Sequence, residues 1–173
     1  MVMLVKLCLC GMFSLYSCYT DWKNYRIRNW ACGCLAAAGI AGNVLWFGWK
    51  GLLSALGGGA VMLCLFPLFA LRMLGAGDVK ALMAIGCVLG AGAAPQALLS
   101  SLLGAGVAAA VVVAARKNMW KRIGAFTAYL RSILQTGRAG PYQQHMDPDG
   151  VFRFSYGIAL GVFAMLAQEL FKR

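Results

Sequence analysis

Long apolar runs alternate with short polar segments over most of the chain. An α-helix that crosses a lipid bilayer needs about 20 predominantly apolar residues, and the runs approach that length. The pattern therefore predicts an all-α polytopic membrane protein with about six transmembrane helices, at residues 2–19, 30–47, 52–71, 79–94, 96–115 and 154–171. The first run is long enough to span the membrane, so we expect it to remain a helix rather than to be cleaved as a signal peptide.

The composition supports the membrane interpretation. Hydrophobic residues make up 61% of the 173 residues and charged residues 12%, whereas soluble domains carry about a quarter charged residues. The 22 glycines suit helices that pack closely through small residues. The length fits one compact bundle, so we expect residues 1–173 to form a single membrane-embedded domain.

The basic residues are distributed unevenly between the two sides of the predicted bundle. If the loop after the first helix is cytoplasmic, twelve Lys and Arg residues lie on the cytoplasmic side and three on the other, with Lys6 inside the first helix. Cytoplasmic loops are enriched in Lys and Arg, so we expect both termini outside and the first, third and fifth loops inside. The net charge of +11 comes mainly from these loops, which suit anionic lipid better than nucleic acid. We therefore predict membrane lipid as a partner and no nucleic acid.

Residues 116–153 form the one long hydrophilic segment and include several basic residues. Side chains recur at helical spacing in its first half, at Trp120, Ile123, Phe126, Thr127, Leu130 and Leu134. This spacing predicts an amphipathic helix in a cytoplasmic loop, either lying on the inner leaflet or packed on the bundle as a linker. Glycine, proline and an Asp-Pro-Asp-Gly turn predict an irregular loop after it.

The seven cysteines all lie within or beside the apolar runs, and the chain has one histidine, His145. The sequence contains no C-x-x-C pair, and residues two apart on a helix face different directions. The cysteines are therefore interpreted as small apolar core residues. We predict no metal site, no disulfide framework and no cofactor.

Only five residues are acidic, and Asp21 and Asp78 are the only two before position 147. Both adjoin apolar runs, and the predicted orientation places both on the cytoplasmic face. An ionisable residue at the edge of a membrane segment is costly to maintain and indicates a functional site. Asp78 alone has a structural alternative, because an aspartate after a glycine-rich turn can also be the N-cap of the following helix. The pair on one face favours function.

Two neighbouring carboxylates provide the groups that peptide hydrolysis requires. Like charges at close range cannot both ionise easily, so such a pair shares one proton. The ionised carboxylate then activates water, and the protonated carboxyl group protonates the leaving group. Serine or cysteine catalysis would instead need a histidine base, and His145 stands alone in a loop.

Three segments resemble motifs of the type IV prepilin peptidases, membrane aspartic proteases of the GxGD class. Residues 75–80, Gly-Ala-Gly-Asp-Val-Lys, resemble the G-x-G-D-x-K motif. Asp21 with Ile-Arg-Asn at 27–29 resembles the first catalytic aspartate with its I-P-N, and residues 154–161 are similar to the P-Y-G-x-A-x-x-x-G start of the last helix. The resemblance implies that Asp21 and Asp78 are the catalytic pair. It implies supporting or substrate-binding roles for Gly75, Gly77, Lys80, Asn29, Tyr156 and Gly157.

The chain departs from these motifs in several places. Arg28 replaces the proline of I-P-N, Ser155 replaces the proline before Tyr156, and Ala76 stands between the two glycines. Longer family members carry a cysteine-rich zinc insert and also methylate the new N-terminus. This chain lacks the insert, so it most resembles the short Tad/Flp-pilus form, and we expect no methyltransferase activity. Lys80 has a second interpretation, because a lysine at a helix end can also extend to lipid headgroups.

The resemblance implies an endopeptidase at the cytoplasmic face of a bacterial inner membrane. Its expected substrate is a prepilin or pseudopilin, cut after the glycine that ends a short basic leader. Whether the enzyme forms a homo-oligomer is left open. An alternative of another class is a non-enzymatic transporter or pilus assembly protein that uses Asp21 and Asp78 for ion handling. Internal repeats would favour that alternative, and we find no convincing repeat in the sequence.

Overall fold

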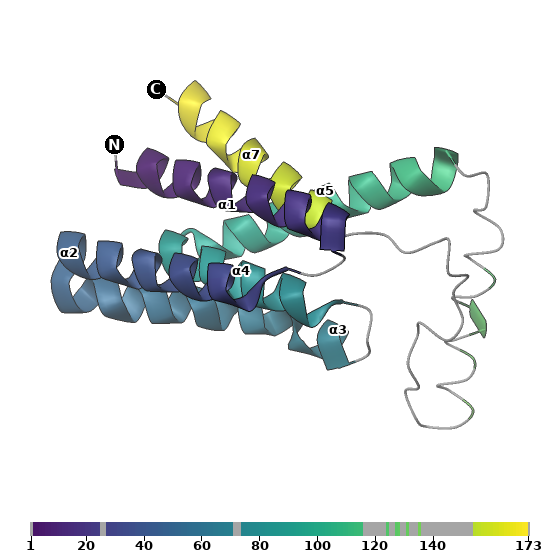
Figure 1. The fold of residues 1–173 in the computed structure, drawn as a ribbon, viewed down its shortest axis with the longest axis horizontal. Helices are drawn as coiled ribbons and strands as arrows, with labels where there is room; N and C mark the ends of the chain where they lie inside the picture. The colour runs from purple at the N-terminus through teal and green to yellow at the C-terminus, as the bar shows by residue number, and fades with distance from the viewer. Residues whose placement is uncertain are drawn as a thin grey trace.

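The computed structural model describes residues 2–24, 27–70, 74–115 and 154–172, together with positions 124, 127, 128, 131 and 135. Within these ranges the regular structure is helical throughout (Figure 1). The helices are α1 (Val2–Asn24), α2 (Asn29–Met62), η1 (Leu63–Leu65), α3 (Phe66–Ala70), α4 (Ala76–Leu89), α5 (Ala94–Ala115) and α7 (Ser155–Phe171). The all-helical prediction is therefore confirmed for these ranges. The amphipathic helix predicted within residues 116–153 lies outside them, apart from the five single positions.

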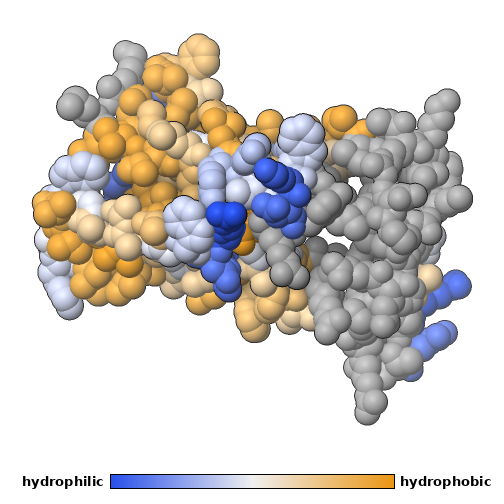
Figure 2. Space-filling model, viewed as in Figure 1, coloured by the Kyte–Doolittle hydropathy of each residue, from blue (hydrophilic) through white to orange (hydrophobic). Residues whose placement is uncertain are grey.

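Within the described ranges, three helical stretches are long and apolar enough to cross a membrane: Val2–Asn24, Asn29–Ala70 and Ala94–Val111. Helix α7 is also apolar but shorter. Large apolar side chains face outward, with Leu45 85% exposed, as expected for a surface in contact with lipid. Figure 2 shows apolar residues over much of the visible face of the bundle. The protein is therefore a membrane protein, and the count of six spans stays a prediction.

Helix α2 is a hairpin of two limbs, which Figure 1 shows side by side. The chain reverses at Gly48, whose φ of 58° and ψ of −138° lie outside the helical region. A residue with a side chain is strained at such a φ, so this reversal favours glycine. After the turn, Gly51 passes so close to the carbonyl group of Asn43 that a Cβ atom would not fit. The reversal at Gly48 therefore lies between the predicted helices at residues 30–47 and 52–71.

Helix α4 packs along α2 through small residues on both helices. A Cβ atom at Gly39 would lie 2.7 Å from Cγ2 of Val88, and a Cβ atom at Gly58 would collide with the backbone carbonyl of Gly86. Leu82 of α4 is fully buried in the same core. Close backbone approach of this kind depends on small residues, and it fixes the position of α4 relative to α2.

Helix α7 lies against α5 and α1. Gly157 and Gly161 bring the backbone of α7 against Ala105 and Ser101 of α5. In Figure 1 the two chain ends lie at one end of the bundle, and the C-terminal end of α1 lies at the opposite end. The start of α7 therefore meets the end of α1, where Asp21 lies.

A buried lysine links the N-terminal half of α1 to two other helices. Lys6 is 8% exposed, and its Nζ donates a hydrogen bond of 2.7 Å to Oδ1 of Asn43 in α2. The amide nitrogen of Asn43 in turn donates to the carbonyl oxygens of Gly39, Cys87 and Val88. Because buried polar groups need hydrogen-bond partners, this cluster ties α1, α2 and α4 together through one asparagine.

One predicted helix is too long at its C-terminal end. The helix expected at residues 79–94 ends at Leu89, because Gly90 adopts a φ of 82° that stops the helical hydrogen-bond pattern. Pro95, the residue between the predicted helices at 79–94 and 96–115, lies in the first turn of α5. Proline is tolerated there, since its missing N–H group has no helical partner to lose.

Another predicted helix is too short. The helix expected at residues 2–19 continues to Asn24, so Asp21 lies near the end of α1 and not in a loop. Thr20, just before it, is buried and donates a hydrogen bond of 3.1 Å from its side chain to the carbonyl oxygen of Ser17. Backbone hydrogen bonds continue past the apolar residues, and the added turn gives Asp21 a fixed backbone.

Candidate active site

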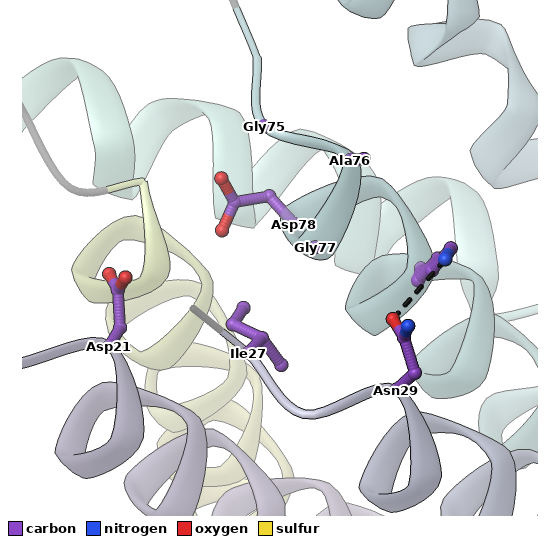
Figure 3. A pocket seen from close by; sticks show the side chains of 8 residues that line it. Asp21, Ile27, Asn29, Gly75, Ala76, Gly77 and Asp78 are labelled. Carbon is purple, nitrogen blue, oxygen red and sulfur yellow. Dashed lines mark hydrogen bonds between the residues drawn. The ribbon is translucent and has the colours of Figure 1, made fainter. Parts of the chain in front are cut away.

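A cavity of about 380 Å³ opens where the end of α1, the link to α2 and the start of α4 meet (Figure 3). Its walls come from short segments that lie far apart in the sequence. The residues that line it are Asp21, Ile27, Asn29, Gly75, Ala76, Gly77, Asp78 and Lys80. The cavity thus brings together six of the eight site residues predicted from the sequence, including both aspartates.

Asp21 is held by a residue from the last helix. Ser155, in the first turn of α7, donates a hydrogen bond of 2.6 Å from its Oγ to Oδ2 of Asp21. Ser155 is 1% exposed, and its carbonyl oxygen accepts a hydrogen bond of 3.4 Å from the thiol of Cys18. Cys18 lies about one turn before Asp21 on α1. Two hydrogen bonds therefore join the end of α1 to the start of α7 beside the cavity.

Asp78 lies in the first turn of α4, ahead of the apolar run predicted to begin at residue 79. Gly75 is the N-cap residue of this helix, with φ −73° and ψ 144°, and its carbonyl oxygen accepts a hydrogen bond of 3.1 Å from the N–H group of Asp78. The alternative in which Asp78 is the N-cap is therefore wrong. Figure 3 shows the carboxyl groups of Asp78 and Asp21 on the same side of the cavity.

Asp78 holds its proton more tightly than an ordinary aspartate. Burial and, second, the negative charge of Asp21 raise the pKa of Asp78 from 3.8 to about 7, against the opposing effect of a hydrogen bond from the backbone of Gly75. Near neutral pH the pair can therefore share one proton. This is the state that acid–base catalysis by two carboxylates requires.

Lys80 turns toward the cavity and is held there by Asn29. Its Nζ donates a hydrogen bond of 3.2 Å to Oδ1 of Asn29, the first residue of α2 (dashed line in Figure 3). Both side chains are exposed and both line the cavity. The bond places a positive charge at the cavity wall, where it can attract an electron-rich group of a substrate.

Gly75 and Gly77 provide the space in which the site is built. A Cβ atom at Gly75 would lie 3.0 Å from Oδ2 of Asp78, so a side chain there would press on the carboxyl group. A Cβ atom at Gly77 would lie 3.3 Å from the Cβ of Ile27, a cavity residue that is only 9% exposed. Neither glycine has a positive φ. Close approach, and not backbone conformation, is the physical reason for glycine at these two positions.

Tyr156 and Gly157 were also predicted to support the site, and the structure places them away from the cavity lining. Tyr156 is 41% exposed, and Gly157 packs against Ala105 of α5. Ser155, which in the sequence is only a departure from a motif, makes the contact with Asp21 instead. The sequence did contain a signal for this contact. Ser155 places a hydroxyl group at the start of the last apolar run, on the same predicted side of the membrane as Asp21.

Among the described residues, the titratable groups that line the cavity are two carboxyl groups and one ammonium group. The described residues contain no group of three or more His, Cys, Asp and Glu side chains placed to hold a metal ion. All seven cysteines lie in the described part of the chain and are free thiols. The lining of the cavity suits hydrolysis by an activated water molecule.

A family model supports the resemblance seen in the sequence. The model of the type IV leader peptidase family matches residues 8–114, which is more than half of the chain. The match includes Asp21 and residues 75–80, whereas α7 with Ser155 lies beyond it. No curated protein and no solved structure matches the chain. The helical membrane fold, the cavity lined by two aspartates and the family match agree, and the chain belongs to the type IV leader peptidase family.

Proposed function

We propose that this protein is an aspartic endopeptidase that removes the basic leader peptide of prepilins or pseudopilins after a glycine. Membership of the leader peptidase family supports the peptidase activity and the class of substrate. The observation that carries the aspartic mechanism is the single cavity that Asp21 and Asp78 line together. The sequence lacks a cysteine-rich insert, so the proposed activity does not include methylation of the new N-terminus.

Hydrolysis in the cavity proceeds with the two carboxyl groups and a water molecule. The ionised carboxylate takes a proton from water as its oxygen attacks the scissile carbonyl carbon, and the protonated carboxyl group protonates the carbonyl oxygen. Collapse of the tetrahedral intermediate breaks the C–N bond, and the leaving nitrogen takes up a proton. A pKa of about 7 for Asp78 supports the sharing of one proton near neutral pH.

The reaction takes place at the cytoplasmic face of a bacterial inner membrane, in a bundle with six spans. The excess of Lys and Arg in the loops on the Asp21 side supports this orientation. In Figure 1 the end of α1 that forms the cavity lies opposite both chain ends, which agrees with an even number of spans. A cytoplasmic site would meet a leader before the substrate's apolar helix leaves the membrane.

Coexpression with a prepilin tests the function and the mechanism together. Asp21→Asn and Asp78→Asn should each lower the rate of leader removal by about 10³-fold, because each removes one of the two proton-transfer roles. Both variants should still accumulate in membranes, since asparagine preserves the size of the side chain. Glu169→Gln is the matched control, because it removes a carboxylate of α7 that does not line the cavity. Mass spectrometry of the product locates the cut relative to the glycine.

The outcomes separate the two candidate functions. Cleavage at the wild-type rate by either aspartate variant would contradict the paired-carboxylate mechanism. If the wild-type protein cleaves no prepilin or pseudopilin, the leader peptidase function is wrong, and ion flux into liposomes that requires both aspartates would support the ion-handling alternative.

A further inference from the structure

The hydroxyl group of Ser155 distinguishes one carboxyl group of the pair from the other. Its Oγ lies 2.6 Å from Oδ2 of Asp21, the length expected when an O–H group donates to an ionised carboxylate. An ionised carboxylate only accepts hydrogen bonds, so the serine is the donor. Asp78 lies in a different setting, in the first turn of α4, where its own N–H group donates to the carbonyl oxygen of Gly75.

Ser155 has little freedom to turn away from Asp21. Its side chain is 1% exposed, and its carbonyl oxygen is held by the thiol of Cys18 on α1. The first turn of α7, which contains Ser155, is closed by a hydrogen bond of 2.9 Å from the N–H group of Gly157 to the carbonyl oxygen of Phe154. The hydrogen bond to Asp21 is therefore formed before a substrate binds.

The start of α7 provides a second reason for charge on Asp21. The N-terminal end of a helix carries a partial positive charge that stabilises a nearby carboxylate. Asp21 receives its hydrogen bond from Ser155, in the first turn of this 17-residue helix. The serine hydroxyl and the helix end thus act in the same direction.

We propose that Ser155 is a positioning residue that holds Asp21 as the ionised carboxylate and leaves the shared proton on Asp78. This inference rests on the proposed endopeptidase function. It assigns Asp21 as the base that activates water and Asp78 as the acid, an assignment that two equivalent carboxylates would not allow.

The proton transfers balance with this assignment. Asp21 takes a proton from water while the water oxygen bonds to the carbonyl carbon, and Asp78 gives its proton to the carbonyl oxygen. When the C–N bond breaks, the proton on Asp21 moves to the leaving nitrogen. The proton of the intermediate's hydroxyl group returns to Asp78 as the carbonyl forms, and the pair regains its starting state.

The groups around the two aspartates imply that the acidic limb of a pH–rate profile reports the ionisation of a carboxyl group. Besides the two aspartates, the titratable groups that lie near the site in the described part of the chain are Lys80 on α4, Cys18 on α1 and Cys32 on α2. Lysine and cysteine ordinarily titrate above neutral pH. A change in the acidic limb therefore reports the carboxylate that must be ionised.

The test is the pH–rate profile of leader cleavage by the purified full-length protein in liposomes. Ser155→Ala removes the donor, so Asp21 should take up a proton more readily. We expect the acidic limb of kcat to move upward by about one pH unit, so that kcat at a pH on the descending limb falls about tenfold while KM is unchanged. Ser155→Thr keeps a hydroxyl group and should restore the wild-type limb.

Two further variants keep the test decisive. Ser155→Cys fills a similar space with a weak donor, so it should shift the limb in the same direction if Ser155→Ala fails to accumulate. Ser101→Ala is the matched control, because Ser101 is also a buried serine, 1% exposed, at the contact between α5 and α7. Its hydroxyl group has no hydrogen-bond partner among the described residues, so its loss should leave the profile unchanged.

The possible results distinguish this inference from the function on which it rests. An unshifted acidic limb in both Ser155→Ala and Ser155→Cys, whatever their kcat, would show that Ser155 is only structural and overturn the inference. A shift that also appears in Ser101→Ala would overturn it as well. Absence of cleavage by the wild-type protein would instead overturn the endopeptidase function, and the inference with it.

Discussion

The carboxyl group of Asp78 titrates at a different pH in the folded chain and in the unfolded chain. Its pKa is about 7 in the folded protein, against an ordinary value of 3.8. Between these values the folded chain holds a proton that the unfolded chain has released, so the free energy of unfolding falls as pH rises. Above pH 7 the fold carries the full cost of a buried charge. The buried carboxyl group of Asp78 therefore weakens the protein in alkaline solution.

Asp78→Asn should for this reason stabilise the protein while it abolishes cleavage. At pH 8 a relieved penalty on the order of 1 kcal/mol should raise the thermal midpoint by roughly 2–4 °C, and the gain should shrink toward pH 4. Thermal unfolding of the purified variant in detergent, followed by circular dichroism, measures this difference. For Glu169→Gln, the difference in thermal midpoint from the wild-type protein should be the same at pH 8 and at pH 4. A lower midpoint for Asp78→Asn at pH 8 would mean that the charged carboxylate stabilises the fold.

The sequence predicts the pair of aspartates because acids are so scarce in the membrane part of the chain. Neither the contact of Ser155 with Asp21 nor the bond of Lys80 to Asn29 follows from hydropathy or motif spacing. Both depend on how separate helices dock. The partners in each bond are 134 and 51 positions apart, so no local pattern records the contact.

At the scale of elements, the glycines at the contact between α2 and α4 set how closely the two helices approach. Gly58 lies against the backbone of Gly86, with no room for even one methyl group. Gly33, in the first limb of α2, has nothing within 4 Å of where a Cβ atom would lie. The same substitution should therefore have opposite effects at the two positions.

Gly58→Ala should lower the free energy of unfolding by about 1–3 kcal/mol, because α4 must move away from α2. Cleavage should fall as well, since the start of α4 carries Asp78. Gly33→Ala should be neutral or stabilise the helix by up to about 1 kcal/mol, because alanine favours the helical conformation. Unfolding in detergent and leader cleavage measure the two effects. Equal stability of the two variants would contradict the close contact between α2 and α4.

The sequence predicts which segments are helical but misplaces two of their ends, for separate physical reasons. Hydropathy shows where the apolar residues of a helix end. Helix α1 continues beyond them to Asn24, because its backbone hydrogen bonds continue. The end of α4 depends on one torsion angle, the positive φ of Gly90, within a run of glycine and alanine. Composition does not reveal which glycine of such a run takes that conformation.

At the scale of the whole molecule, the two ends of the bundle differ in their polar chemistry. The end of α1 that carries Asp21 forms the cavity, and Lys6 lies 15 positions earlier, or about 22 Å along the helix. There Lys6 and Asn43 form a buried cluster that links three helices. One end of the bundle thus contains the cavity lined by the two aspartates, whereas the other end contains a buried hydrogen-bonded cluster that holds three helices together.

Reporter fusions test the proposed sidedness of these ends. A reporter inserted near Gly140 should be cytoplasmic, and one fused after Arg173 should be periplasmic, because Lys and Arg are retained on the cytoplasmic side. A fusion at Lys50, next to the reversal of α2, should match the C-terminal fusion. The reverse pattern would separate the cavity from cytoplasmic leaders and contradict the proposed location.

The bond between Ser155 and Asp21 also has a consequence for the order in which the site is completed during synthesis. Asp21 and Asp78 are both synthesised before α7, and Ser155 follows Asp21 by 134 positions. At about 5–20 residues per second, a ribosome needs roughly 7–27 seconds to cover that distance. Once Asp78 has been made, and until Ser155 follows it, the nascent chain has both carboxyl groups but lacks the hydroxyl group of Ser155. The hydrogen bond that we propose to distinguish the two carboxyl groups therefore forms only after α7 has been synthesised and has docked against α1.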